Sequence, residues 1–257
     1  MGYIAIIGRF VLEFFAASGR LSLFTWHSTA AVFAPPVYLR EIIRQVIFIG
    51  YFSLPVVALT SFFTGGVLAL QIYYGGNQLN SEAIVSTIVA LGITRELGPV
   101  LGGLMVAGRV SAAIAAEIGT MRVTEQIDAL TTLSTDPFKY LVAPRLISAT
   151  LCMPVLAFFA DIIGVMGGFV VGTQSLDFNS AFYVQRTVNF LELDDITSGL
   201  IKAAVFGFII ALMGCYHGYN SRGGAQGVGR ATTNAVVTAS ILILMANYIM
   251  TSLFFTA

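Results

Sequence analysis

Two adjacent charges, Arg95 and Glu96, stand in an otherwise apolar stretch and are the leading candidates for chemistry in this chain. A charge inside a membrane span is costly, so such residues usually face a bundle interior or a wet cavity. Neighbours in sequence point about 100° apart on a helix, so these two side chains do not face each other. We treat both as functional residues, with a structural pair satisfied by neighbouring helices as the alternative.

Other polar features interrupt the apolar sequence. Gly98-Pro99 follows the charged pair and predicts a kink whose freed backbone groups are satisfied by a neighbour or by water. Asp161 is a lone acid that we expect to join a polar packing network, with a role in gating as the alternative. Lys202 is expected to extend toward the membrane interface, and contact with a lipid phosphate is its alternative.

Several kinds of chemistry have no counterpart in the sequence. The only lysines are Lys139 and Lys202, and neither follows the glycine pattern of a phosphate-binding loop. His27 and His217 have no metal-ligand spacing around them, and no nucleophile lies beside a base. The formal net charge is +0, so no nucleic-acid footprint exists. We expect no catalytic residue, no metal, no cofactor and no hydrolysis of ATP by this chain alone.

The elements that position these residues are membrane helices. The chain has 257 residues, of which 57% are hydrophobic and 10% charged, whereas soluble domains carry roughly 25% charged residues. Mean hydropathy is +0.86. We predict an all-α integral membrane protein with five transmembrane helices, an N-terminal interfacial helix and a cytoplasmic coupling helix. Residues 1–37 form the interfacial amphipathic segment and residues 38–257 the transmembrane domain.

The spans follow from the lengths of the apolar runs, since about 20 residues cross a bilayer. Between them we expect an elbow helix at 38–45, a turn at 75–81, a polar loop at 173–196 and a glycine-rich loop at 219–230. The predicted spans are residues 46–74, 82–116, 146–172, 197–217 and 232–255.

A row of small residues marks the second span at every fourth position. Its members are Gly103, Ala107, Ser111, Ala115 and Gly119. Small residues at this spacing let two helix backbones approach closely inside a bilayer. We therefore expect close packing along this row, on more than one neighbour because the row drifts around the helix.

The row runs into a short amphipathic segment at residues 123–134. Its apolar residues fall at helical spacing, with Thr124 as the expected N-cap. Asp136-Pro137 is expected to begin the next helix. The pattern leaves two interpretations open, a tight interfacial connector and a knob inserted into the groove of a partner. The residues proposed for such a contact are Glu125, Gln126, Ile127, Asp128 and Leu130.

Lysine and arginine counts set the orientation. One side of the membrane holds nine of these residues in its loops and the other holds Arg186 alone. The N-terminus and residues 117–145 are therefore expected in the cytoplasm, and five spans then put the C-terminus outside.

The run RELGPVLGGLMVAGRVSAAIAAEIGTMRVTEQIDAL, residues 95–130, closely resembles the signature of the MlaE-type permeases. SFFTGGVLALQ at residues 61–71 resembles the first span of that family, and GRATT at 229–233 resembles its last cytoplasmic loop. The resemblance covers about residues 38–257. Asp161 departs from it, because many members have an apolar residue there.

The resemblance implies the membrane subunit of an ABC transporter that moves phospholipids or related lipids between membranes. The implied partners are an ATP-binding subunit in trans, a small cytoplasmic regulatory subunit, a periplasmic ring of lipid-binding subunits and a second copy of the permease. Arg95 and Glu96 would face the lipid headgroup or gate its cavity, and residues 123–134 would be the coupling helix. The end of the first span would line the lipid site, through Leu70, Gln71, Tyr73 and Tyr74.

Two points stay open beside the resemblance. Tyrosines at the end of a span also mark the headgroup interface, without any lipid pocket. A proton-coupled carrier or channel that titrates Glu96 and Asp161 is the alternative function, although five spans without an inverted repeat fit it poorly. The lack of a transit peptide favours a bacterial inner membrane.

Overall fold

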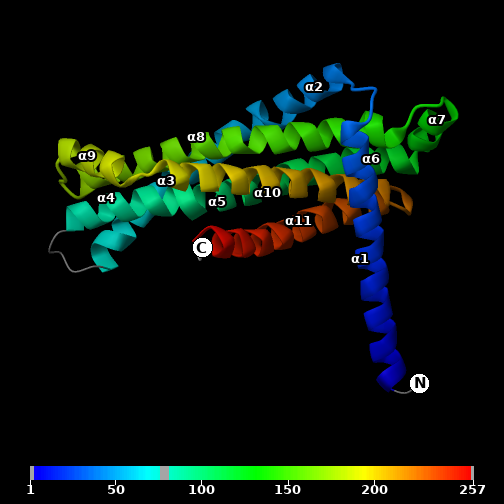
Figure 1. The fold of residues 1–257 in the computed structure, drawn as a ribbon, viewed down its shortest axis with the longest axis horizontal. Helices are drawn as coiled ribbons and strands as arrows, with labels where there is room; N and C mark the ends of the chain where they lie inside the picture. The colour runs from blue at the N-terminus through cyan, green and yellow to red at the C-terminus, as the bar shows by residue number, and fades with distance from the viewer. Residues whose placement is uncertain (1–2, 76–80, 256–257) are drawn as a thin grey trace.

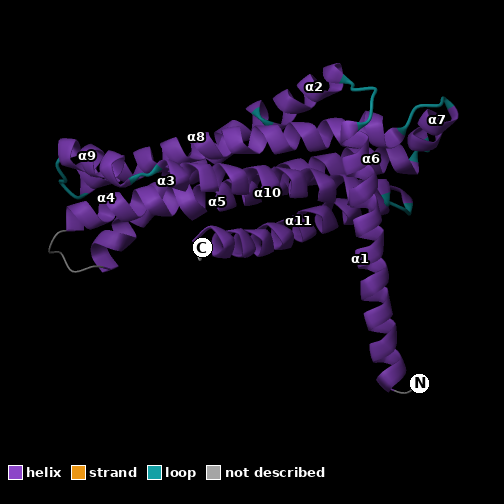
Figure 2. Ribbon diagram, in the orientation of Figure 1, coloured by secondary structure: helices purple, strands orange, loops and turns teal. Residues whose placement is uncertain are grey.

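The computed structural model describes residues 3–75 and 81–255, and within these ranges all regular structure is helical (Figures 1 and 2). Five segments are long and apolar enough to cross a membrane, which confirms the predicted all-α membrane fold. They are Leu39–Gly75, Glu82–Val123, Phe138–Ser175, Leu193–Tyr219 and Gly224–Phe254. Most of the turn predicted at 75–81 lies outside the described residues.

Most spans combine several helical segments. The first half of the chain holds α1 (Tyr3–Phe33), α2 (Leu39–Ile49), the 3-10 turn η1 (Tyr51–Ser53), α3 (Leu54–Gly75), α4 (Ser81–Gly92), η2 (Ile93–Leu97), α5 (Gly98–Val106), η3 (Ala107–Ser111) and α6 (Ala112–Val123). The second half holds α7 (Gln126–Thr132), η4 (Phe138–Val142), α8 (Ala143–Ser175), α9 (Ser180–Phe190), α10 (Leu193–Tyr219) and α11 (Gly224–Phe255). The segments η2, η3 and η4 are π-helical.

The spans lie side by side along the long axis of the molecule, with α9 at one end and α7 at the other (Figure 1). Glycines let the central helices touch: a Cβ at Gly65 would collide with the carbonyl of Gly164, and one at Gly167 with that of Phe62. This close approach of α3 and α8 supplies the packing that apolar burial does not supply in a bilayer.

Helix α1 leaves the bundle and crosses its long axis steeply (Figure 1), and it is not among the five spanning segments. It is held at its C-terminal half by aromatic packing. The Phe24 ring lies 5.3 Å from that of Phe138 and 5.4 Å from that of Tyr216. Such a direction suits a helix that lies along a membrane surface, as the prediction for residues 1–37 requires.

Several predicted boundaries are wrong: the second span extends to Val123 and the third begins at Phe138, and three further differences follow. Residues 173–196 contain the helix α9, whose first turn is capped by Asn179: its Oδ1 accepts from the backbone N–H groups of Ala181 and Phe182. The glycine-rich loop is short, because α11 already begins at Gly224. The elbow helix continues to Ile49, beyond its predicted end at 45.

Candidate functional site

The π-helical segment η2 carries both Arg95 and Glu96. It ends at Leu97, and the N–H of the next residue, Gly98, donates to the carbonyl of Ile93. In a regular helix the N–H of residue 99 would bond to the carbonyl of Arg95, but Pro99 has no N–H. The Arg95 carbonyl instead accepts a hydrogen bond of 3.0 Å from Nζ of Lys202 on α10. A neighbouring helix thus satisfies the freed group, as the Gly98-Pro99 pair predicts.

Glu96 is the centre of a hydrogen-bonded network between three spans. Its Oε1 accepts from Lys202 Nζ at 2.7 Å and from Thr251 Oγ1 at 2.8 Å. Its Oε2 accepts from Asn247 Nδ2 at 2.8 Å. The carboxylate therefore ties η2 to α10 and α11, while 35% of the side chain remains exposed.

Lys202 lies inside this network, so the prediction that it extends toward the membrane interface is wrong. Its side chain is 0% exposed, and Nζ also donates to Thr251 Oγ1 at 2.8 Å. Gly199 explains how α10 comes so near: a Cβ there would collide with the carbonyl oxygen of Thr94. The lysine follows one turn later and reaches Glu96.

Arg95 pairs with a second acid on α10. Its Nε donates to Asp195 Oδ1 at 2.6 Å, and the side chain of Asp195 is 2% exposed. The other oxygen of Asp195 accepts from the backbone N–H of Glu192 at 3.1 Å, which completes a capping box at the start of α10. The Arg95 side chain remains 36% exposed.

We call Arg95, Glu96, Asp195, Lys202, Asn247 and Thr251 the charge network. It holds two cations and two carboxylates, so its formal charges cancel. Charges at this depth are retained when they are paired and hydrogen-bonded. The partial exposure of Arg95 and Glu96 leaves one side of the charge network accessible to a polar ligand.

The predicted lipid-contacting residues of the first span lie at the end of α3. Gln71 lines a hollow of about 340 Å³, together with Leu97 of η2. Tyr73 packs on Phe178, with ring centroids 5.8 Å apart, and Tyr74 is exposed. Leu70 is half-buried. The structure thus brings Gln71 next to η2, whereas Tyr73 turns toward the connection between α8 and α9.

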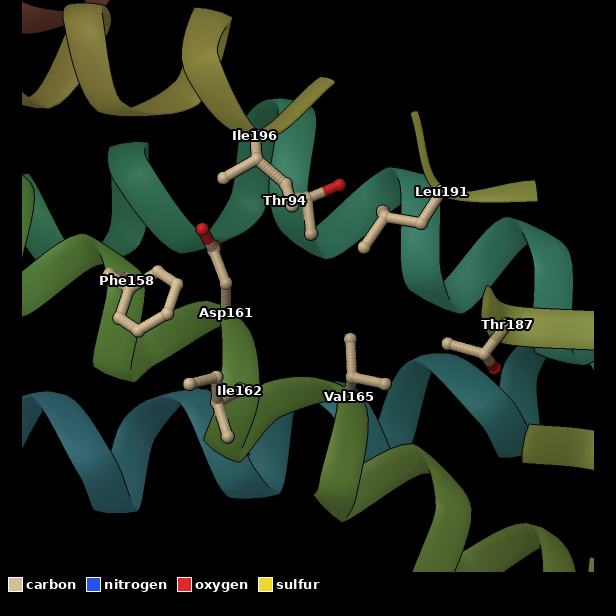
Figure 3. Close-up of a pocket in the computed structure, with 8 residues that line it drawn as sticks. All are labelled: Thr94, Phe158, Asp161, Ile162, Val165, Thr187, Leu191 and Ile196. Carbon is tan, nitrogen blue, oxygen red and sulfur yellow. The ribbon is translucent and has the colours of Figure 1, made fainter. Parts of the chain in front are cut away.

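Asp161 lies apart from the charge network. It is 5% exposed, and neither carboxyl oxygen has a hydrogen-bonding partner among the described residues. The predicted polar packing network around Asp161 is therefore wrong. Figure 3 shows Asp161 on α8 directed into a pocket that Thr94 of η2 also lines.

The row of small residues lies against α10 and α11. Gly103 faces the ring of Phe206, at 3.3 Å from an ideal Cβ, and Gly119 faces Ser221 and Val228 at 3.4 Å. Ala107, Ser111 and Ala115 are fully buried between them. The row therefore faces two neighbouring helices in succession.

Helix α7 stands at the opposite end of the molecule from α9 (Figure 1). Ile127 is buried and Leu130 half-buried, whereas Glu125, Gln126 and Asp128 are exposed. An ion pair of 2.6 Å between Arg122 and Asp128 joins α7 to the end of α6.

Two local predictions near α7 have different outcomes. Thr124 is not the N-cap, because α7 begins at Gln126 and Glu125 takes the N-cap position with a φ of 60°. The Thr124 hydroxyl instead donates to the carbonyl of Thr120. Asp136 does cap the next helix, since its Oδ1 accepts from the N–H of Phe138 at 2.9 Å.

Sequence reasoning missed the partners that complete the charge network. Asn247 and Thr251 are spaced at i and i+4, so they lie on one face of α11, and this pattern is a usable signal. Asp195 was visible only as one of several loop acids. Among the described residues, no three His, Cys, Asp or Glu side chains gather closely enough to hold a metal ion.

Comparison with known proteins places this architecture in a family. Residues 42–253 match the family described as Permease MlaE. A probable ABC transporter permease protein of Rickettsia conorii is 59% identical over 249 residues, which cover 97% of this chain and 96% of that protein.

Two more distant relatives have names that specify a process or a compartment. The intermembrane phospholipid transport system permease protein MlaE of Haemophilus influenzae is 34% identical over 263 residues, covering 100% of this chain and 99% of that protein. The chloroplastic protein TRIGALACTOSYLDIACYLGLYCEROL 1 of Arabidopsis thaliana is 35% identical over 219 residues, covering 85% of this chain and 63% of that protein. The chain belongs to the MlaE permease family.

Proposed function

We propose that this chain is the membrane permease subunit of an ABC transporter that moves phospholipid, or a related lipid, between the inner and outer membranes. The observation that carries the proposal is the charge network, in which a fully buried lysine and a half-exposed arginine meet two carboxylates beside a π-helical segment. Intramembrane charges of this kind mark substrate pathways. The names of the Haemophilus and Rickettsia relatives agree with this assignment.

The charge network suits the phosphate of a lipid headgroup. A guanidinium binds phosphate through two parallel hydrogen bonds, and Arg95 remains 36% exposed on the accessible side. A headgroup phosphate competes with Asp195 for Arg95 and with Glu96 for Lys202. Glu96 then acts as a gate for the headgroup, because it pairs with Lys202 whenever the phosphate is absent.

The hollow at the end of α3 suits the acyl chains. It has a volume of about 340 Å³ and is lined by Phe63, Val67 and Leu68 in addition to Gln71 and Leu97. Its apolar walls begin one residue from Glu96, so a headgroup at the charge network would place hydrocarbon there. In this proposal Leu70, Tyr73 and Tyr74 contact the lipid beyond the hollow.

Helix α7 is proposed to couple the permease to an ATP-binding subunit in trans. Its exposed Glu125, Gln126 and Asp128 would meet that subunit, while Ile127 fixes the helix to the bundle. Because the Arg122–Asp128 ion pair joins α7 to α6, a displacement of α7 reaches the span that carries η2. The N-terminus and α7 then lie in the cytoplasm, and the C-terminus in the periplasm of a bacterium.

The full assembly proposed here has two copies of the permease, with the lipid site between them. A small cytoplasmic subunit regulates the ATP-binding subunit, and a periplasmic ring of lipid-binding subunits receives or delivers the lipid. The family membership supports these partners, and co-purification tests them.

The test is purification of the detergent-extracted chain from its native membrane, with mass spectrometry of proteins and lipids. The wild type is compared with a double variant, Arg95→Ala and Glu96→Ala. The matched control is Arg44→Ala with Glu41→Ala, which removes an Arg–Glu pair of 4.0 Å from the surface of α2, where the Arg44 side chain is 74% exposed.

We expect the wild type and the control to retain an ATP-binding subunit and phospholipid, and the double variant to retain the subunit with little lipid. Equal lipid in all three proteins contradicts the role of the charge network. If the chain is purified without an ATP-binding subunit, and if transport stops when the proton gradient is removed, the protein is a proton-coupled carrier instead.

A further inference from the structure

A second polar site lies on the other side of η2 from the charge network. It is a pocket of about 250 Å³ between α8, η2, α9 and the start of α10 (Figure 3). Thr94 lines it, and residues two positions apart on a helix point in nearly opposite directions, so Glu96 faces away. The apolar walls are formed by Phe158, Ile162, Val165, Leu191 and Ile196.

Asp161 is the only acid among the residues that line this pocket. It is 95% buried, since its exposed fraction is 5%. Both of its oxygens are enclosed, and neither has a hydrogen-bonding partner in the described part of the chain. Its Oδ1 lies against the Cα of Gly98, where a Cβ would collide with it. A carboxylate left in this state is costly, because burial removes its water without supplying a donor.

A second unsatisfied group lines the same pocket. The hydroxyl oxygen of Thr187 on α9 is also enclosed and has no hydrogen-bonding partner among the described residues. The hydroxyl of Thr94 donates to the carbonyl of Ala90 at 2.9 Å, so its lone pairs remain available as acceptors. The polar groups of the pocket therefore come from three different elements, and the two Asp161 oxygens are acceptors without a donor among the described residues.

The acceptors and the apolar walls together define the occupant. A primary ammonium group has three N–H donors and a positive charge, which suit the two unpartnered oxygens of the Asp161 carboxylate. The rim is apolar and outward-facing, since Phe158 is 45% and Ile162 49% exposed. A ligand that enters from this side carries hydrocarbon behind its charged group.

We propose that the Asp161 pocket binds the primary ammonium headgroup of a membrane lipid. The site is separate from the charge network, which offers cations to a phosphate, and it does not depend on the transport function proposed above. The ammonium nitrogen lies against the carboxylate of Asp161, and the rest of the lipid leaves the pocket between Phe158 and Ile162.

The test measures thermal unfolding of the full 257-residue chain in dodecylmaltoside micelles, after removal of co-purified lipid. The first probe is dodecylamine, and dodecanol and dodecyltrimethylammonium are the control amphiphiles. Dodecanol has the same tail without charge, and the quaternary cation has no N–H to donate. A second arm adds phosphatidylethanolamine or phosphatidylcholine to the micelles, so that a lipid headgroup is distinguished from a free alkylamine.

Two isosteric variants are compared with the wild type. Asp161→Asn removes the charge in the pocket, and Asp177→Asn makes the same change at an exposed acid in the connection between α8 and α9. Because Asp161 has no hydrogen-bonding partner to lose among the described residues, its variant is expected to fold. A third variant, Thr187→Val, removes the hydroxyl and leaves the carboxylate.

Dodecylamine and phosphatidylethanolamine are expected to raise the melting temperature of the wild type and of Asp177→Asn by about 5 °C or more at high ligand excess. The rise is lost in Asp161→Asn and retained in Thr187→Val, because the Thr187 hydroxyl lies across the pocket from Asp161 (Figure 3). A rise that persists in Asp161→Asn, no rise in the wild type, or an equal rise with the quaternary cation overturns the proposal. A response to dodecylamine without one to phosphatidylethanolamine overturns the assignment to a lipid.

Discussion

Glu96 and Asp161 are two carboxylates on opposite sides of the short segment η2. Glu96 belongs to η2, and Asp161 of α8 lines a pocket on the other side of it. Glu96 accepts three hydrogen bonds from α10 and α11, and one of its donors is a lysine with no exposed surface. Asp161 accepts none from the described residues, although it is the more deeply buried acid.

The difference lies in what each acid needs in order to remain charged. The charges of the charge network are paired within one chain, so a ligand there has to displace an existing partner. The Asp161 pocket is incomplete within the described chain, so a ligand there adds partners. Substitutions that remove a polar group should therefore have opposite signs at the two sites, and four measurements test this contrast.

The largest effect is expected from Lys202→Met. The change leaves Glu96 without its cation and the Arg95 carbonyl without its donor. Breaking a buried pair on one side costs about 3–5 kcal/mol, and we expect about 3 because Glu96 is 35% exposed. Denaturant unfolding in micelles measures the free energy.

Lys139→Met provides the matched control for this change, because the hydrogen bond that Lys139 Nζ donates to the carbonyl of Pro35 is exposed to solvent. We expect it to change the free energy of unfolding by no more than about 0.5 kcal/mol. Adding Glu96→Gln to Lys202→Met should recover part of the loss. Equal losses in both lysine variants would show that the charge network contributes no stability.

The second effect is expected from Asp195→Asn. Asp195 accepts from Arg95 and from the N–H of Glu192, and its side chain is 2% exposed. Loss of a charged acceptor should lower the free energy of unfolding by about 2 kcal/mol. Asp194→Asn is the control, since Asp194 is adjacent in sequence but exposed. The contrast fails if both substitutions have the same effect.

The third effect has the opposite sign. Asp161→Asn removes a buried charge that has no partner among the described residues. In lipid-free micelles we expect the free energy of unfolding to rise by about 1 kcal/mol. A clear loss of stability would mean that the carboxylate has a structural role and that the two sites are alike.

The smallest effect compares one substitution at both sites. Thr251→Val removes a hydroxyl that donates to Glu96 and accepts from Lys202. Thr187→Val removes a buried hydroxyl without a partner in the described residues. The first should lower the free energy of unfolding by about 1 kcal/mol, and the second should leave it unchanged or raise it slightly. Thermal melting of the two variants side by side distinguishes these outcomes.

The spans, and the position of Arg95 and Glu96 inside one of them, could be predicted from sequence, because the length of apolar runs and the rarity of charge within them are local properties. That a neighbour satisfies a backbone carbonyl freed by Pro99 was predictable for the same reason. Helix α9 was missed although Asn179 offered a capping signal, since its mixed polarity resembles that of a loop.

The partners of Glu96 were not predictable in the same way. Lys202, Asn247 and Thr251 lie 106, 151 and 155 residues away along the chain. Their meeting depends on how closely α10 approaches η2 at Gly199, which is a property of tertiary packing. Neutral polar residues such as Asn247 are also common enough in membrane helices that none stands out alone.

The missing N–H of Pro99 has a mechanical consequence for the whole bundle. The donor that completes η2 belongs to α10, so a backbone hydrogen bond of one helix depends on the position of another. Sliding α10 by a single residue, about 1.5 Å, would withdraw Nζ from the Arg95 carbonyl in a medium without water to replace it. Separating the two segments therefore costs this hydrogen bond unless water or a ligand brings a substitute donor.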